Sequence, residues 1–307
     1  MLVLFYIYVL NSFFWLVFGK SFISRSLCKN LQPDAKFYMG VPKNMNLTLK
    51  INTRQIALTA IFSAMYAVLR IIPTVPMIGV AGVTFSLSDI LAPLYGIILG
   101  PYIGGASVII GTFTAMSAKP PIFLGLDFLP AFVNAVALGF LVRKKWLPVI
   151  VLNSVLLLAF VLNPLTLNFV NIPFGTTNLI FPFVWLHVIA LIVLLSPLGL
   201  KAGQWIETIR SKKAIAGFAI LAFIGTMMQH LMGNILYENI FVHVTHFMSP
   251  ESLAVRWNLV FFLYPWERLV LIILAVIVGV PLFRVLKKTL LPQAKSAAIP
   301  QDQNIAQ

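Results

Sequence analysis

The sequence predicts an all-α fold, a polytopic membrane helical bundle of about eight core spans with one further candidate span at the N-terminus. Composition is the first reason, because 60% of the 307 residues are hydrophobic, 10% are charged and the mean hydropathy is +0.96. Soluble domains are about half apolar and roughly a quarter charged. The second reason is that the apolar residues form long runs, comparable with the about 20 residues that one helical crossing requires.

The core spans are bounded mainly by prolines, because a proline begins or breaks a helix more readily than it continues one. They are expected at 55–72, 84–99, 101–118, 125–142, 147–162, 178–199, 214–236 and 263–286. Between the second and third spans, Gly96, Gly100 and Gly104 recur every four residues. Small residues at this spacing let two helices approach closely, so we expect a tight turn there.

Lysine and arginine form short clusters between the apolar runs, and the clusters fall on one side of the predicted bundle. They comprise Lys50 and Arg54; Arg143, Lys144 and Lys145; Lys201, Arg210, Lys212 and Lys213; and Arg284, Lys287 and Lys288. In membrane proteins the cytoplasmic loops carry the excess of Lys and Arg. We therefore expect a multi-pass protein of the cell membrane with both ends of the core in the cytoplasm, and we attribute the net charge of +14 to orientation rather than to nucleic-acid binding.

Three segments are expected along the chain: an N-terminal hydrophobic extension at 1–44, a transmembrane core at 45–292 and a polar C-terminal tail at 293–307. The apolar run from Leu2 to Phe18 fits either an additional span or a misassigned start, since Met45 opens a natural-looking beginning. A signal peptide is disfavoured, because no basic region precedes this run and no A-x-A cleavage site follows it.

Polar side chains inside the predicted spans concentrate toward the outer side of the membrane. An ionisable group at this depth costs a few kcal/mol, so it is expected to face a cavity or a partner. A one-sided cluster suits a pocket open to the outside better than a conduction path, which needs polar groups through the full thickness. The candidate substrate-binding residues are Asp89, Asp127, His230, Asn234, Glu238 and Trp266.

Two features of this set have alternative interpretations. His230, Asn234 and Glu238 repeat every four residues and are expected to share one helix face, where they would either line the pocket or form interhelical hydrogen bonds. Trp266 either stacks on a flat ring of the ligand or belongs to the aromatic belt at the membrane interface.

Catalytic and metal sites are not expected. Cys28 is the single cysteine, which excludes an internal disulfide and a Cys-based metal cluster. His243 and His246 form an H-x-x-H pair, but in a predicted outer loop without the helical H-E-x-x-H arrangement of a zincin. The sequence contains no G-x-S-x-G or Walker A pattern, so any ATP that drives the protein is used by another chain.

Ala57, Ala60, Ala64 and Ala67 recur at helical spacing along the first core span and form one stripe of small residues, the alanine stripe. Lipid tails are as apolar as leucine, so membrane helices associate chiefly through the close packing that small residues permit. The alanine stripe is therefore a predicted docking face for a membrane partner.

Three segments of the chain resemble the substrate-binding S components of energy-coupling factor (ECF) transporters. They are RQIALTAIFSAMYAVL at 54–69, YGIILGPYIGGASVIIG at 95–111 with Asp89 before it, and RLVLIILAVIVGVPLFRVLKK at 268–288. The resemblance covers roughly 54–142 and 214–288. It implies a protein that binds a vitamin or related micronutrient outside and works with a membrane coupling protein, the T component, and two cytoplasmic ATPases, without a cofactor of its own.

The resemblance also implies roles for particular segments. The coupling protein would dock on the alanine stripe, and the loop at 71–83 would cover the pocket. S components have fewer helices than the predicted core, so the surplus pair at about 147–199 is expected to be an inserted hairpin that leaves both ends of the core inside.

The main alternative is a self-sufficient secondary transporter of a small organic solute, a class that commonly shows repeated halves and broken helices near the midplane. No clear repeat relates 54–142 to 178–286, although Pro93, Pro182 and Pro265 are candidate helix breaks. A membrane-embedded enzyme is the third class considered, and the sequence offers no catalytic constellation for it.

Overall fold

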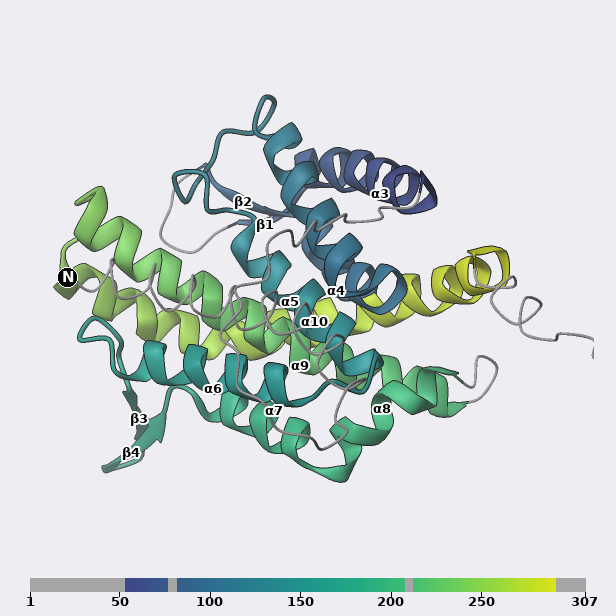
Figure 1. The fold of residues 1–307 in the computed structure, drawn as a ribbon. Coiled ribbons are helices and arrows are strands. Elements are labelled where there is room, and N and C mark those ends of the chain that lie inside the picture. Colours follow the sequence, from purple (N-terminus) through teal and green to yellow (C-terminus); the bar gives the residue numbers. More distant parts are fainter. Residues whose placement is uncertain (1–52, 77–81, 208–211, 291–307) are drawn as a thin grey trace, which may run out of the picture. The chain divides into compact units, whose positions relative to one another are not determined.

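The computed structural model describes residues 53–76, 82–207 and 212–290, which form helices and two short β hairpins (Figure 1). The chain divides into two compact units, 1–57 and 58–307, and the packing described below is that of the second unit by itself. The predicted N-terminal extension at 1–44, with its candidate span, and the predicted tail at 293–307 lie outside the described residues.

The described elements follow one another from α3 to α10. They are α3 (Thr53–Ile71), β1 (Pro73–Pro76), β2 (Thr84–Ser86), α4 (Ser88–Ala115), α5 (Leu129–Val142), α6 (Leu147–Val161), β3 (Phe169–Phe174), β4 (Thr177–Pro182), α7 (Trp185–Leu195), α8 (Pro197–Glu207), α9 (Lys212–Glu238), the π-helical η2 (Asn239–Val244) and α10 (Pro250–Leu290). β1 pairs antiparallel with β2, and β3 pairs antiparallel with β4.

Four of the described helices are long and apolar enough to cross a membrane, namely α3, α4, α9 continued by η2, and α10. A fifth crossing results if α7 and α8, which are bent by 70° at a short break, count as one span. α5 and α6 are shorter apolar helices. The structure thus supports a helical membrane protein, but it does not confirm eight core spans.

Two predicted spans, 84–99 and 101–118, form the single element α4, which is interrupted at Gly100. Gly100 has φ 82° and ψ −178°, a conformation that glycine adopts readily because it has no Cβ. A Cβ on Gly104 would lie 2.6 Å from the carbonyl oxygen of Tyr95, whereas nine residues of straight helix would separate these positions by about 13 Å. The chain therefore reverses at Gly100, in agreement with the tight turn predicted from the glycine spacing.

α5 packs against this reversal. Gly139 of α5 approaches the backbone of Pro101 so closely that a Cβ would collide with it. Next to this contact, Arg143 donates from Nη1 to the carbonyl of Gly139 at 3.3 Å and from Nη2 to the carbonyl of Leu99 at 3.5 Å. The basic cluster after α5 thus lies at the Gly100 end of α4, and the start of α4 lies at the opposite end.

The predicted span at 178–199 is wrong at its start, because 177–182 is strand β4 and helix α7 begins at Trp185. The hairpin turn is supplied by Gly175, which has φ 62°, and the flanking segments are rich in the aromatic and branched residues that favour strands. The predicted connection at 237–262 is also wrong in part. It contains η2 and the first turns of α10, which begins at Pro250.

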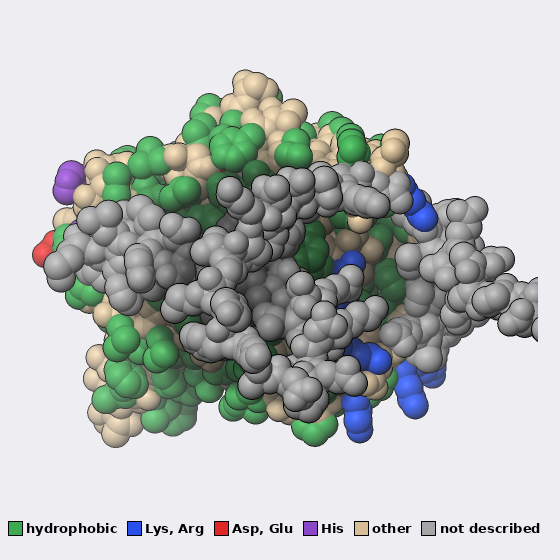
Figure 2. Space-filling view, viewed as in Figure 1, with side chains coloured by type: hydrophobic (Ala, Val, Ile, Leu, Met, Phe, Trp, Pro, Cys, Tyr) green, Lys and Arg blue, Asp and Glu red, His purple; other side chains and the backbone are tan. Residues whose placement is uncertain are grey.

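The surface of the second unit is largely apolar, as a lipid environment requires. On α10 the side chains of Phe262, Ile273 and Ile277 are 47–61% exposed. On the face drawn in Figure 2, most Lys and Arg side chains gather toward one end, where α8 and the C-terminal part of α10 lie in Figure 1. Separation of the basic residues to one end is the pattern expected of a membrane protein with a fixed orientation.

Close packing at Gly104 leads to a first prediction. Replacing Gly104 by Ala should cost about 1–3 kcal/mol of stability, because the added methyl group meets a backbone carbonyl that cannot move aside cheaply. The measurement is the thermal unfolding midpoint of the detergent-purified protein.

Gly233→Ala is the matched control for this prediction. The nearest atom to a Cβ at Gly233 is Cγ of Pro130 at 4.0 Å, so this variant should be neutral or gain up to about 1 kcal/mol from helix propensity. Equal midpoints for the two variants would show that the arms of α4 do not pack as described.

Candidate functional site

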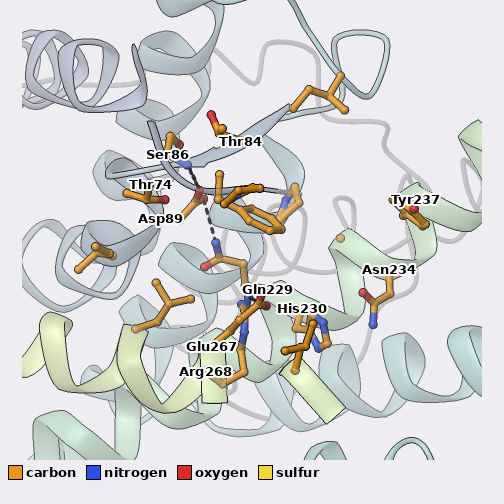
Figure 3. A pocket seen from close by; sticks show the side chains of 18 of the residues that line it. Thr74, Thr84, Ser86, Asp89, Gln229, His230, Asn234, Tyr237, Glu267 and Arg268 are labelled. Carbon is orange, nitrogen blue, oxygen red and sulfur yellow. Dashed lines mark hydrogen bonds and ion pairs between the residues drawn. The ribbon is translucent and has the colours of Figure 1, made fainter. Parts of the chain in front are cut away.

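A cavity of about 510 Å³ lies between the start of α4, the β1–β2 hairpin, the connection at 116–128, α9 and α10. Its lining combines charged, amide and aromatic side chains with aliphatic residues of α10. Ligand pockets of proteins commonly have volumes of about 300–1,000 Å³ and mostly apolar walls with a few placed polar groups. The cavity is therefore the candidate binding site (Figure 3).

Asp89 occupies the first turn of α4, where the helix dipole favours a negative charge. Its Oδ2 accepts hydrogen bonds from the backbone N–H and the hydroxyl of Ser86, both at 3.1 Å. Its Oδ1 accepts one from Nε2 of Gln229, also at 3.1 Å. Figure 3 shows Gln229 reaching from α9 toward Asp89 and Ser86.

The same Gln229 continues the network into the core. Its Oε1 accepts a hydrogen bond of 2.7 Å from Nδ2 of Asn134, a residue of α5 with no exposed surface. Asp89, Gln229 and Asn134 thus form one chain of hydrogen bonds, the amide chain, that joins α4, α9 and α5. Oδ1 of Asn134 is buried without a partner among the described residues. The two hydrogen bonds of the amide chain connect buried polar groups of three helices and so specify how these helices meet.

Asp127 organises the connection at 116–128. Its carboxylate accepts hydrogen bonds from the backbone N–H groups of Ile122 and Phe123 at 2.9 and 3.0 Å, and it pairs with Nη2 of Arg70 at 3.3 Å. Asp127 is 5% exposed. A buried carboxylate with three donors is fully satisfied, so its first role is to fix the loop and the guanidinium of Arg70 at the cavity wall.

Lys119 joins this connection to the hairpin. Its Nζ donates a hydrogen bond of 2.9 Å to the carbonyl oxygen of Thr84. Burial lowers the pKa of the Lys119 ammonium and the nearby Arg70 lowers it further, while Asp89 and Asp127 act in the opposite direction.

Arg268 of α10 is less well satisfied. It is 5% exposed, and its Nη2 contacts Oε2 of the adjacent Glu267 at 3.4 Å. Its Nε is buried without a partner, and so is Nδ2 of Asn234 on α9, a residue that is 7% exposed. Both of these atoms belong to residues that line the cavity.

Neighbouring ring side chains hold the imidazole of His230 in place. Its Nδ1 shares a hydrogen bond of 3.1 Å with Nε2 of His187, and both imidazoles stack on the ring of Tyr264 at centroid distances of 5.0 and 5.5 Å. The hydroxyl of Tyr264 in turn donates to the carbonyl oxygen of Phe183 at 3.0 Å. This stack orients the face of His230 that lines the cavity.

The structure brings together five of the six predicted substrate-binding residues, since Asp89, Asp127, His230, Asn234 and Trp266 all line the cavity. Trp266 is 69% exposed, so it sits at the margin of the cavity and also suits the interfacial belt. Whether these residues bind a substrate remains a prediction.

Glu238 is not among the lining residues. Its carboxylate accepts hydrogen bonds from Nδ2 of Asn163 at 2.6 Å and from the hydroxyl of Thr166 at 2.9 Å. Eight residues of α-helix rotate the chain by roughly 80° beyond two full turns, so Glu238 does not share the face of His230. Glu238 thus bonds to the connection that follows α6 instead of lining the cavity, and these bonds join a helix to a loop rather than two helices.

Three cations of the cavity wall, Arg70, Lys119 and Arg268, were not predicted as site residues. Arg70 lies at the outer end of the predicted span 55–72, and Lys119 directly follows the predicted span 101–118. Lys and Arg are scarce on that side, so a cation there is itself a signal of a buried partner. Arg268 forms an ion pair with the adjacent Glu267, and both residues line the cavity.

The described residues contain no group of three or more His, Cys, Asp or Glu side chains placed to hold a metal ion. Within the described part of the chain, His243 belongs to η2 and His246 follows it without forming such a group. Comparison of the chain with protein-family models, curated proteins and solved structures finds no match.

The amide chain leads to the second prediction. Replacing Gln229 by Leu leaves an oxygen of Asp89 and the amide of Asn134 without partners, each at a cost of about 1–3 kcal/mol. Adding Asn134→Leu removes one of the two orphaned groups, so the double variant should lose less stability than the sum of the single variants. Thermal or denaturant unfolding of the purified variants measures this coupling.

Asn258→Leu is the control, because Asn258 is exposed and donates to the carbonyl of Ala254 in its own helix. It should have little effect. Strictly additive losses at Gln229 and Asn134 would mean that the amide chain does not join the helices.

Proposed function

We propose that this chain is an integral-membrane substrate-binding subunit for the uptake of a vitamin or related micronutrient, energised by separate ATPase subunits through a membrane coupling protein. The observation that carries the proposal is the cavity of about 510 Å³, which is lined by the polar side chains of Asp89, Gln229, Asn234 and Arg268 among apolar residues. The resemblance to S components supports the same function.

The distribution of polar groups favours binding over conduction. Between Lys213 and Gln229, α9 carries one polar side chain, the hydroxyl of Thr226, which donates to the carbonyl of Ala222 in its own helix. A conducting path requires polar or ionisable groups through the whole membrane. The half of α9 that is distant from the cavity has no polar or ionisable side chain available for such a path.

The exposed side of α3 supports the proposed partner. Ala60 and Ala64 are exposed, as is Ala57 in the other compact unit, whereas Ala67 is 6% exposed. Ile61 and Val68 flank them and are 63% and 62% exposed. The exposed part of the alanine stripe thus stays available for the close helix packing that a coupling protein would make.

The energy source is the point on which the proposal and its main rival differ. The sequence has no Walker A pattern, so ATP would be hydrolysed by partner chains rather than here. A secondary transporter would instead work alone on an ion gradient. This chain carries no enzyme activity in the proposal.

Isolation of the tagged chain from its own cells tests the proposal directly. The expected result is co-isolation with an ATPase pair and a coupling protein, and uptake into proteoliposomes that requires all of them together with ATP. Uptake by the chain alone, driven by an ion gradient, would overturn the proposal and establish the secondary transporter.

A third prediction concerns docking. Replacing Ala60 and Ala64 together by Leu should leave ligand binding intact and abolish uptake, because bulk on the stripe separates helices that must touch. Ala216→Leu, at an exposed position of α9, is the control and should transport normally. Normal transport by the Ala60/Ala64 double variant would show that this face contacts lipid instead of a partner.

A fourth prediction concerns the cavity. His230→Leu or Asn234→Leu should weaken ligand binding by about 1–3 kcal/mol, the range for loss of a buried hydrogen-bond partner, while the protein stays folded. Titration of detergent-purified variants with a panel of vitamins measures the loss. Asn258→Leu, outside the cavity, should bind like the unaltered protein, and equal affinity in all three variants would place the site elsewhere.

A further inference from the structure

Two buried polar atoms of the cavity wall lack a hydrogen-bond partner within the described residues, and both are N–H donors: Nε of Arg268 and Nδ2 of Asn234. The carboxylates of Asp89 and Asp127, in contrast, already accept hydrogen bonds from the protein at both of their oxygens. A ligand that satisfies the two unpartnered donors must therefore bring acceptors.

The positive charge of Arg268 indicates that the acceptor group of the ligand is an anion. Arg268 is 5% exposed, and its guanidinium contacts the carboxylate of Glu267, on its own helix, at 3.4 Å. That contact is long for a charge-assisted hydrogen bond, which is usually about 2.7–2.9 Å. An underpaired buried guanidinium is costly, and its planar fork matches a carboxylate.

The remainder of the wall is apolar. Phe85 and Phe123 come from the hairpin and the 116–128 connection, and Val260, Leu271 and Leu274 come from α10. Such a surface contributes binding free energy in proportion to the apolar area that it covers. The complementary ligand thus has an apolar body as well as an acceptor group.

We infer that the cavity takes an organic carboxylate with an apolar ring or chain, whose carboxylate is held by Arg268 with Asn234 as a second donor. This inference rests on the proposed function and names the substrate class of the same site. Arg70, Lys119 and Arg268 share the wall with three carboxylates, those of Asp89, Asp127 and Glu267. A cationic ligand fits less well, because both oxygens of Asp89 and of Asp127 already accept hydrogen bonds and Glu267 is paired with Arg268.

The test is a thermal-stability and binding titration of the full chain in detergent with vitamins of three charge classes. Biotin, pantothenate and nicotinate are the carboxylates, nicotinamide and riboflavin are uncharged, and thiamine is the cation. The expected result is a concentration-dependent rise in the unfolding midpoint with at least one carboxylate and none with the uncharged or cationic compounds.

The outcomes separate the two proposals. Binding of thiamine, riboflavin or nicotinamide without any carboxylate would overturn the inference and leave the uptake function standing. Binding of no compound from any class would overturn the substrate-binding function and this inference with it.

Variants of Arg268 test the role of this residue independently of the choice of compound. Arg268→Met should weaken binding of the carboxylate at least about tenfold, while the unliganded protein stays folded, because the Glu267 side chain that loses its partner is 21% exposed and remains hydrated. Arg268→Lys keeps the charge without the fork and should recover part of the affinity.

Arg284→Met is the matched control on the same helix. Arg284 lies in the basic cluster at the C-terminal part of α10 and does not line the cavity, so its replacement should leave carboxylate affinity unchanged. Unchanged affinity in Arg268→Met, or a lowered midpoint of its unliganded form with affinity retained, would assign Arg268 a structural role and overturn the inference.

Discussion

Close backbone contact at glycine is the constraint on which the rest of the structure depends. Lipid offers no hydrophobic drive for one helix to leave it for another, so association has to come from packing at short range. Gly100 reverses α4, Gly104 lets its two arms touch, and Gly139 brings α5 against the turn. These contacts fix the Gly100 end of α4, and a rigid helix therefore carries Asp89 to a defined place at the other end.

At that other end the structure is governed by the cost of polar groups in a medium of low dielectric constant. Asp89 is satisfied through Gln229 and Asp127 through Arg70, so these carboxylates stabilise the walls of the cavity. Nε of Arg268 and Nδ2 of Asn234 are not satisfied from within the described residues. Apolar side chains at these positions would stabilise the fold as well as the unsatisfied polar groups do. Ligand binding therefore explains these groups at the cavity better than stability does.

Sequence alone identified the membrane character, the reversal near Gly100 and five of the residues that line the cavity. The position of each ionisable residue along its apolar run was sufficient to identify the cavity residues, because ionisable residues at one level of a bundle tend to face the same interior. It failed at Glu238, where the drift of the helix away from a four-residue repeat turned the side chain toward Asn163. It also failed for β3 and β4, whose residues are as apolar as a span, and for Lys119, whose partner is a backbone carbonyl that no sequence pattern reveals.

The central claim is that the cavity opens to the outside while the basic end faces the cytoplasm. Thr74 lines the cavity, Lys144 belongs to the basic cluster after α5, and both side chains are exposed. The most direct measurement is labelling of Thr74→Cys and Lys144→Cys in intact cells with a membrane-impermeant maleimide, in a Cys28→Ser background. The account predicts that Thr74→Cys is labelled at once and Lys144→Cys after permeabilisation; labelling of Lys144→Cys in intact cells, with Thr74→Cys protected, would contradict it.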